Sequence, residues 1–237
     1  MAKITLIEDG ILPKIEGFAI YPLDGQLIIR TQSGFTKKGL KNNPKYANCK
    51  KNASEFGRVS SVGKHLRLAL QDFLPRKNNL AVVNALTKKL RAVLQCDTIS
   101  ARGERLLSCA FATSEALDMM NGYAFNPDGI GYAKCIKDVK AVELTFETLA
   151  TPDMASYLAL QTIEFGFNFQ SMAHQLNCSD LRFFSLPNKL GTIRLPREQG
   201  RVFEGTSFLL VAMIFYKKVG DSFVALSEDG MNQLVIL

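Results

Sequence analysis

A change in hydrophobic period along the chain constrains the fold more than any other feature. Between residues 54 and 93, apolar residues recur every three or four positions on both sides of Pro75, which predicts two amphipathic helices joined by a turn. From about residue 105 onward the segments shorten and alternate, as in VELTFETL and TIEFGFNF, which is typical of half-buried strands. We therefore expect a two-helix segment followed by a sheet.

Two-residue turns connect several of the strand-like segments. Asp24-Gly25 lies between FAIYPL and QLIIRT, and Gly220-Asp221 lies between SFLLVAMIFYKKV and SFVAL. Both dipeptides favour the positive φ angles of tight hairpins. These patterns predict an α+β fold, namely a β-sandwich-like sheet with an inserted basic arm and a two-helix segment.

Two domain arrangements are compatible with this order of elements. In the first, residues 1–100 form an N-terminal hairpin, a basic arm and a helical hairpin, and residues 101–237 form a β-rich domain. In the second, the chain is one continuous domain whose N-terminal strands join the C-terminal sheet. The N-terminal segments are too short to bury a hydrophobic face alone, which favours the second arrangement.

The charge of the chain is concentrated in one region. Residues 25–96 carry 15 lysines and arginines against only Glu55 and Asp72, a net charge of +13, whereas the remaining 165 residues sum to −6. Like charges gathered on one region repel one another unless an outside group neutralises them. The basic region therefore indicates an anionic partner.

The candidate binding residues are basic side chains of an irregular arm, SGFTKKGLKNNPKYANCKKN, and of the first helix. They are Lys37, Lys38, Lys41, Lys45, Lys50, Lys51, Arg58, Lys64 and Arg67. Lysines and arginines that contact phosphates give affinity without sequence preference and make binding depend on salt. The sequence has no RNP-like, KH-like or zinc-finger spacing, so base-specific recognition is not predicted.

Catalytic and metal-binding patterns are missing from the sequence. SGFTKKG and DGIGYAKC contain glycines, but neither has the spacing of a phosphate loop or of a dinucleotide fingerprint. The chain has only two histidines, His65 and His174, and its five cysteines form no C-x-x-C pair. We therefore expect no catalytic residue, no metal and no cofactor.

Unpaired cysteines, together with the lack of a signal sequence or apolar span, indicate a cytoplasmic protein with no membrane span.

Several short motifs resemble those of an uncharacterised bacterial protein family. They are SGFTKKGLK, NASEFG, VGKHLR and the terminal FYKKVGDSFVALSEDGMNQLVIL. The resemblance implies a Ser-Gly-x-x-Lys basic arm, a Glu-Phe-Gly helix start and a β-rich C-terminal half, but no known activity. The matching residues are Ser33, Gly34, Lys37, Ser54, Glu55, Phe56, Gly57, Gly63, Lys64 and Arg67. It implies that the arm and the first helix act as one unit.

Three functional hypotheses follow. The first is a non-enzymatic protein that binds nucleic acid or another polyanion through the basic arm and helix. The second is a self-assembling structural subunit, a homo-oligomer in which the basic region of one copy docks on the acidic body of the next. The third is an enzyme whose site is assembled from scattered carboxylates and arginines. The charge distribution favours them in this order.

Overall fold

The structure is a computed structural model of the 237-residue chain. It describes residues 2–5, 15–23, 26–32, 40, 42–74, 80–126, 129–132, 134–147, 149–186, 190–198, 200, 203–226 and 231–237. The chain divides into two compact units, Met1–Lys51 and Asn52–Leu237. Helices and antiparallel sheets occur together, which confirms the expected α+β class.

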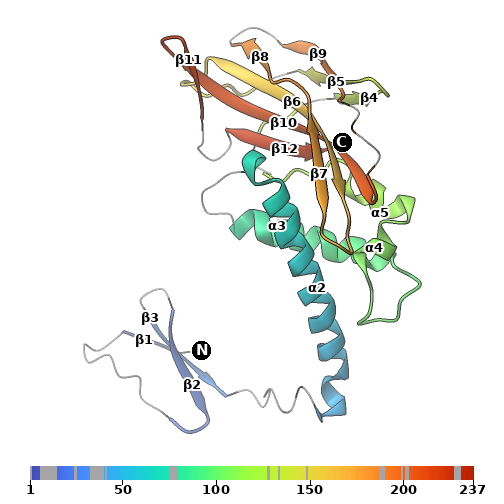
Figure 1. The fold of residues 1–237 in the computed structure, drawn as a ribbon. Coiled ribbons are helices and arrows are strands. Elements are labelled where there is room, and N and C mark those ends of the chain that lie inside the picture. The colour runs from blue at the N-terminus through green and yellow to red at the C-terminus, as the bar shows by residue number, and fades with distance from the viewer. Residues whose placement is uncertain are drawn as a thin grey trace. The chain divides into compact units, whose positions relative to one another are not determined.

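The first unit contains a small antiparallel sheet (Figure 1). Its strands are β1 (Ala2–Thr5), β2 (Phe18–Leu23) and β3 (Gln26–Thr31), in the spatial order β1-β3-β2. β2 pairs with β3 from Leu23 opposite Gln26, so the two strands form the expected hairpin, although its turn residues lie outside the described residues. The arrangement in which these strands complete the C-terminal sheet stays a prediction.

The first long helix starts earlier than the sequence pattern predicted. Asn43 precedes a 3-10 turn, η1 (Pro44–Tyr46), and its side chain accepts a hydrogen bond from the Lys45 amide at 3.0 Å. The helix α2 (Ala47–Ala69) follows directly, so the expected start at Ser54 and Glu55 is wrong. The apolar stripe begins only at Val59, and exposed helix turns carry no hydrophobic period that could have revealed them.

A second helix packs beside α2, which confirms the two-helix segment. After η2 (Gln71–Phe73), the chain forms α3 (Leu80–Val93) and η3 (Leu94–Cys96). The predicted stripes are buried in one apolar cluster and include Val59, Val62 and Leu66 of α2 and Leu86, Leu90 and Val93 of α3. The hydrophobic period therefore identified most of the packed faces of both helices. Val83, which was expected on the apolar stripe of α3, lines the surface groove, and Val82 is buried instead.

Two short helices and nine strands complete the described part of the second unit. They are α4 (Leu107–Ala110), α5 (Ser114–Met120), β4 (Lys134–Lys137), β5 (Ala141–Phe146), β6 (Tyr157–Phe167), β7 (His174–Cys178), β8 (Arg182–Ser185), β9 (Gly191–Pro196), β10 (Thr206–Val219), β11 (Ser222–Ala225) and β12 (Asn232–Ile236). The larger sheet follows β11-β10-β6-β7, with β12 beside β10 and β8 beside β6, and a smaller sheet has the order β4-β5-β9.

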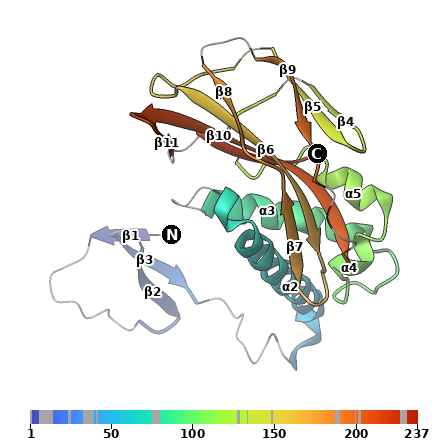
Figure 2. The same ribbon diagram turned by 45° about the horizontal axis from the view of Figure 1, so that its top comes forward.

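The larger sheet is buried on both faces, and strand β10 shows why. Because successive side chains of a strand point to opposite faces, Phe208 and Leu210 enter the cluster shared with the helices, whereas Leu209 and Val211 enter the cluster shared with the smaller sheet. In Figure 2, the helices lie along one face of the larger sheet and β4, β5 and β9 lie over the other. The second unit is thus a sheet-on-sheet arrangement with an added helical layer.

A buried carboxylate fixes the loop between η3 and α4. Asp97 is 1% exposed, and its side chain accepts hydrogen bonds from the amides of Ile99, Ser100 and Leu106 at 3.1, 2.9 and 2.9 Å. Burial alone raises the pKa of Asp97, but hydrogen bonds from Leu106, Ser100 and Ile99 outweigh it and lower the pKa to about 2. The carboxylate is therefore ionised at neutral pH and holds this loop against the helices.

Gly63 lies where α2 packs against α3, and it provides a test of that packing. A Cβ atom added there would lie 3.5 Å from Nη1 of Arg67 and 3.6 and 3.9 Å from the Leu90 and Leu86 side chains, all ordinary contacts. Gly63→Ala is therefore expected to be tolerated and to raise the free energy of unfolding by up to about 1 kcal/mol, because alanine favours helix. Gly63→Leu would overpack the contact and cost about 1–3 kcal/mol. Denaturant unfolding of both variants measures these changes. An equal loss of unfolding free energy in Gly63→Ala and Gly63→Leu would contradict the described contact between α2 and α3.

Candidate nucleic-acid interface

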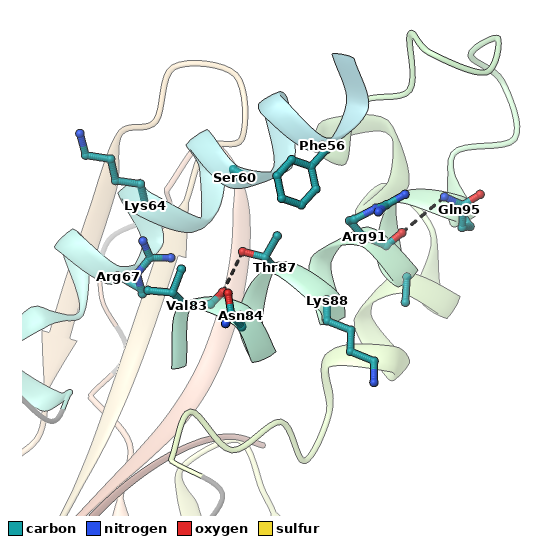
Figure 3. A pocket seen from close by; sticks show the side chains of 11 residues that line it. Phe56, Ser60, Lys64, Arg67, Val83, Asn84, Thr87, Lys88, Arg91 and Gln95 are labelled. Atoms are coloured by element: carbon teal, nitrogen blue, oxygen red, sulfur yellow. Dashed lines mark hydrogen bonds between the residues drawn. The ribbon is translucent and has the colours of Figure 1, made fainter. Parts of the chain in front are cut away.

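A groove with a volume of about 720 Å³ runs between α2 and α3 on the surface of the second unit (Figure 3). It is lined by Phe56, Ser60, Lys64, Arg67, Val83, Asn84, Thr87, Lys88, Arg91, Ala92 and Gln95. All of these residues belong to α2, to α3 or to the η3 turn that continues α3. The groove is therefore formed by local helical segments close in sequence.

Helical spacing explains which side chains enter the groove. On α2, Phe56, Ser60 and Lys64 follow one another at four-residue intervals and so share one face of the helix. On α3, Asn84 and Lys88 have the same spacing. These faces flank the buried apolar stripes, so packing the stripes together brings the two polar faces to the same surface.

The groove is positively charged, and no acid lines it among the residues that the structure describes. Its lining includes Lys64, Arg67, Lys88 and Arg91, and none of the residues that line it is Asp or Glu. Lys64 and Lys88 are exposed, and Figure 3 shows their side chains extending away from one another, one from each helix. The arrangement provides several ammonium and guanidinium groups that a polyanion could contact together.

Arg67 is the least exposed of these cations. Its Nη1 atom is buried and has no hydrogen-bond acceptor among the described residues. Burial lowers the pKa of Arg67, and the nearby Tyr123 partly opposes this change. Burial also raises the pKa of Tyr123, to about 12, and Arg67 partly opposes that change. An arginine stays protonated despite this lowered pKa, and Tyr123 is neutral at neutral pH. The Arg67 guanidinium therefore keeps its full positive charge, and its Nη1 donor has no acceptor among the described residues.

Phe56 adds an aromatic surface to the groove. Its side chain is 48% exposed, and the Arg91 guanidinium carbon lies 5.8 Å from the centroid of its ring. This distance allows a cation–π contact, which holds the ring and the guanidinium beside one another. An exposed ring next to cations can stack on a planar group while the cations contact a charge attached to it.

Some polar groups in the groove are engaged within the helices. The Thr87 hydroxyl donates to the Val83 carbonyl at 2.7 Å, and the Gln95 side-chain amide donates to the Arg91 carbonyl at 3.4 Å, as the dashed lines in Figure 3 show. The Gln95 side-chain oxygen accepts from Arg105. Ser60 and Asn84 also line the groove and have hydroxyl and amide groups that suit phosphate or base edges.

The residues predicted from sequence lie in several places. Lys64 and Arg67 line the groove, whereas Arg58 lines a different cavity. Lys45, Lys50 and Lys51 are exposed in the first unit. Lys37, Lys38 and Lys41 lie outside the described residues. The structure brings together Lys64 and Arg67 with two cations that the sequence interpretation did not include.

Those two cations are Lys88 and Arg91 of α3. The sequence showed them on the polar side of the second helix, but their position beside α2 depends on how the two helices pack. A signal was present, because the second helix has basic residues and no acid along its length. A helical hairpin predicted from sequence could therefore have suggested that both polar faces contribute to one surface.

Comparisons with known proteins add no family assignment. The chain matches no protein-family model, no curated protein and no solved structure. The resemblance to an uncharacterised bacterial family stays a prediction.

No helix in the described ranges is long and apolar enough to cross a membrane. Within the same ranges, no three or more His, Cys, Asp or Glu side chains are grouped so that they could hold a metal ion.

Proposed function

We propose that the α2–α3 groove binds single-stranded nucleic acid without sequence preference. The observation that carries this proposal is the composition of the groove. Two lysines, two arginines and an exposed phenylalanine line one surface, and no Asp or Glu is among its described lining residues. Proteins that bind single strands commonly combine a positively charged groove with an aromatic side chain on which a base stacks. Both parts occur here within two adjacent helices.

The same composition favours binding to the phosphate backbone over reading of bases. Phosphate contacts by lysine and arginine hold the strand but carry no sequence information. Phe56 is accessible to an unpaired base, and every base has a face that can stack on it. A duplex would not offer its bases in this way. The groove therefore favours a single strand with little discrimination among bases.

A salt titration tests the proposed binding. Fluorescence anisotropy of a labelled oligodeoxythymidylate would be measured at salt concentrations from about 50 to 200 mM. If the four groove cations each neutralise one phosphate, the logarithm of the association constant should fall with the logarithm of salt with a slope of about −3. Binding that is unaffected by salt, or no binding at low salt, would refute the proposal.

Replacing Phe56 separates stacking from charge. Phe56→Ala is expected to weaken oligonucleotide binding about tenfold, since base–aromatic stacking contributes about 1–3 kcal/mol per base. The salt slope should not change, because no cation is removed. Leu80→Ala is the matched control: Leu80 is 65% exposed at the start of α3 and does not line the groove. If both variants bind as tightly as the unmodified chain, Phe56 does not stack on the ligand.

A further inference from the structure

A second cavity, with a volume of about 460 Å³, lies on a different face of α2. Its walls come from α2, from the loop and helix α4 at residues 105–108, and from the turn between β6 and β7. Its lining shares no residue with the groove between α2 and α3. The volume falls in the range of about 300–1,000 Å³ that small-molecule sites occupy.

Most of this cavity is apolar. Val59 and Val62 of α2, Leu94 and Leu107 contribute buried side chains to it. The ring of Phe169 also lines the cavity and stacks on Phe111, with the ring centroids 4.4 Å apart. Phe169 is thus held in place by the core behind it. Such a surface suits the hydrocarbon part of a ligand.

Two arginines, Arg58 and Arg105, line the cavity and give it positive charge. Arg58 donates through Nη2 to the Gly103 carbonyl, and Arg105 donates through Nη1 to the Gln95 side-chain oxygen. The Nε atom of each is buried and has no acceptor among the described residues. Neither forms an ion pair in the part of the chain that the structure describes, and no Asp or Glu lines the cavity. Both guanidinium groups stay protonated, so an anion placed in the cavity would gain charge compensation and charge-assisted hydrogen bonds.

Neighbouring groups hold both arginines in position. Glu55 is 3% exposed, and its carboxylate accepts a hydrogen bond from the Gly103 amide at 2.7 Å, which fixes the turn that Arg58 contacts. The Asp97 carboxylate binds the Leu106 amide at 2.9 Å and so fixes the loop that carries Arg105. The two carboxylates thus hold backbone segments beside the cavity without lining it.

The β6–β7 turn has an uncommon backbone conformation where it meets the cavity. Met172 has a φ of +63°, a region that residues other than glycine rarely adopt. The Asn168 side-chain oxygen accepts from the amides of Gln170 and Ser171, both at 2.9 Å, and the Met172 amide donates to the Asn168 carbonyl at 2.9 Å. This turn places a flexible methionine side chain at the cavity, where it can adjust to an apolar ligand.

We infer that this cavity binds a small amphiphilic carboxylate, with its apolar body against Val62, Phe169 and Met172 and its carboxylate beside Arg58 and Arg105. Guanidinium groups match the planar geometry of a carboxylate and keep their positive charge when partly buried. The inference is independent of the proposed nucleic-acid binding, because it concerns a different cavity and different residues.

Octanoate is the probe that tests this inference on the full-length chain. The chain is labelled with methyl-¹³C methionine, and the Met172 methyl resonance is assigned by its loss in Met172→Leu. As octanoate is added, this resonance should shift, and the shift should saturate with a dissociation constant below about 1 mM. The methyl resonance of Met154, which is 51% exposed and does not line the cavity, should not move. No shift of Met172 would overturn the inference, and so would equal shifts of both methyl groups.

The carboxylate requirement is tested with related probes and variants. Octanol, which has no charge, should bind at least about tenfold more weakly than octanoate, since it loses the charge-assisted hydrogen bonds. Arg58→Met and Arg105→Met should weaken octanoate binding by a similar factor in calorimetric titrations. Arg194→Met should leave it unchanged, because the Arg194 side chain is 64% exposed and lines neither the cavity nor the groove. Equal affinity for octanol, tighter binding of octyl phosphate, or no effect of either arginine variant would overturn the assignment. If an arginine variant fails to fold, the Met172 methyl shifts of the unmodified chain with octanoate and octanol provide the test.

Discussion

Replacing Lys64, Lys88 and Arg91 together by glutamate is expected to weaken oligonucleotide binding more than about 100-fold at low salt. Each substitution removes a cation from the groove and places a carboxylate there, which repels phosphate. Lys64, Lys88 and Arg91 are exposed, so the free energy of unfolding should change little. Arg67 is left in place because its guanidinium is partly buried and its replacement could disturb helix packing. Fluorescence anisotropy measures the binding, and thermal unfolding checks the fold.

A charge-matched control separates the groove from net charge. Lys134, Lys140 and Lys218 are exposed and do not line the groove, and their replacement by glutamate changes the net charge by the same amount. This control should lose only the modest affinity that comes from overall charge. If it binds as weakly as the groove variant, the attraction is distributed over the surface and the groove is not the binding site.

Asp97→Ala is expected to lower the free energy of unfolding by about 3 kcal/mol, because it leaves several buried amides without their acceptor. Asp97→Asn keeps one acceptor oxygen and should cost less. Denaturant unfolding at neutral pH measures both. Asp72→Ala is the control. Because Asp72 is exposed, this substitution should change the free energy of unfolding by less than about 0.5 kcal/mol. Equal small losses at both positions would show that Asp97 does not hold the loop.

The pH dependence of stability provides a second test of Asp97. Its pKa is about 2 in the folded chain, below the ordinary value of 3.8. The folded state therefore gains stability from the ionised carboxylate above about pH 4, and this stability is lost as the pH falls towards about 2. The difference in unfolding free energy between the unmodified chain and Asp97→Asn should shrink over this interval. A difference that stays constant down to pH 2 would contradict the assigned pKa.

The sequence predicted the elements of the second unit better than the surfaces they form. Hydrophobic periods identified α2, α3 and the strand-rich part, because Val59, Leu86 and Phe208 lie on faces that face the core. They did not reveal the short helices α4 and α5, which lie after residue 105, where only strand-like segments were expected. The Gly220-Asp221 hairpin was also confirmed, since β10 pairs with β11 across it and Gly220 has a positive φ of +59°. These features depend on residues that are close in sequence, which is why patterns could reveal them.

The groove and the second cavity depend on contacts that no local pattern encodes. Lys88 joins Lys64 in one groove only because α3 packs beside α2. Arg58 was grouped with Lys64 from its charge alone, but its side chain donates to the Gly103 carbonyl and lines the second cavity instead of the groove. The predicted start of the first helix was wrong for a different reason. The turns before Val59 are mostly exposed, their one buried side chain is the polar Glu55, and they have no apolar period.

Photo-crosslinking of a 4-thiouridine-labelled single-stranded RNA, followed by mass spectrometry of the crosslinked peptides, tests the central claim most directly. The account predicts that crosslinks fall mainly on the segments that line the groove, residues 56–67 and 83–95, and that they decrease when salt is raised. Phe56 is expected among the crosslinked residues. Crosslinks confined to other segments of the chain, with these two segments unmodified, would contradict the account.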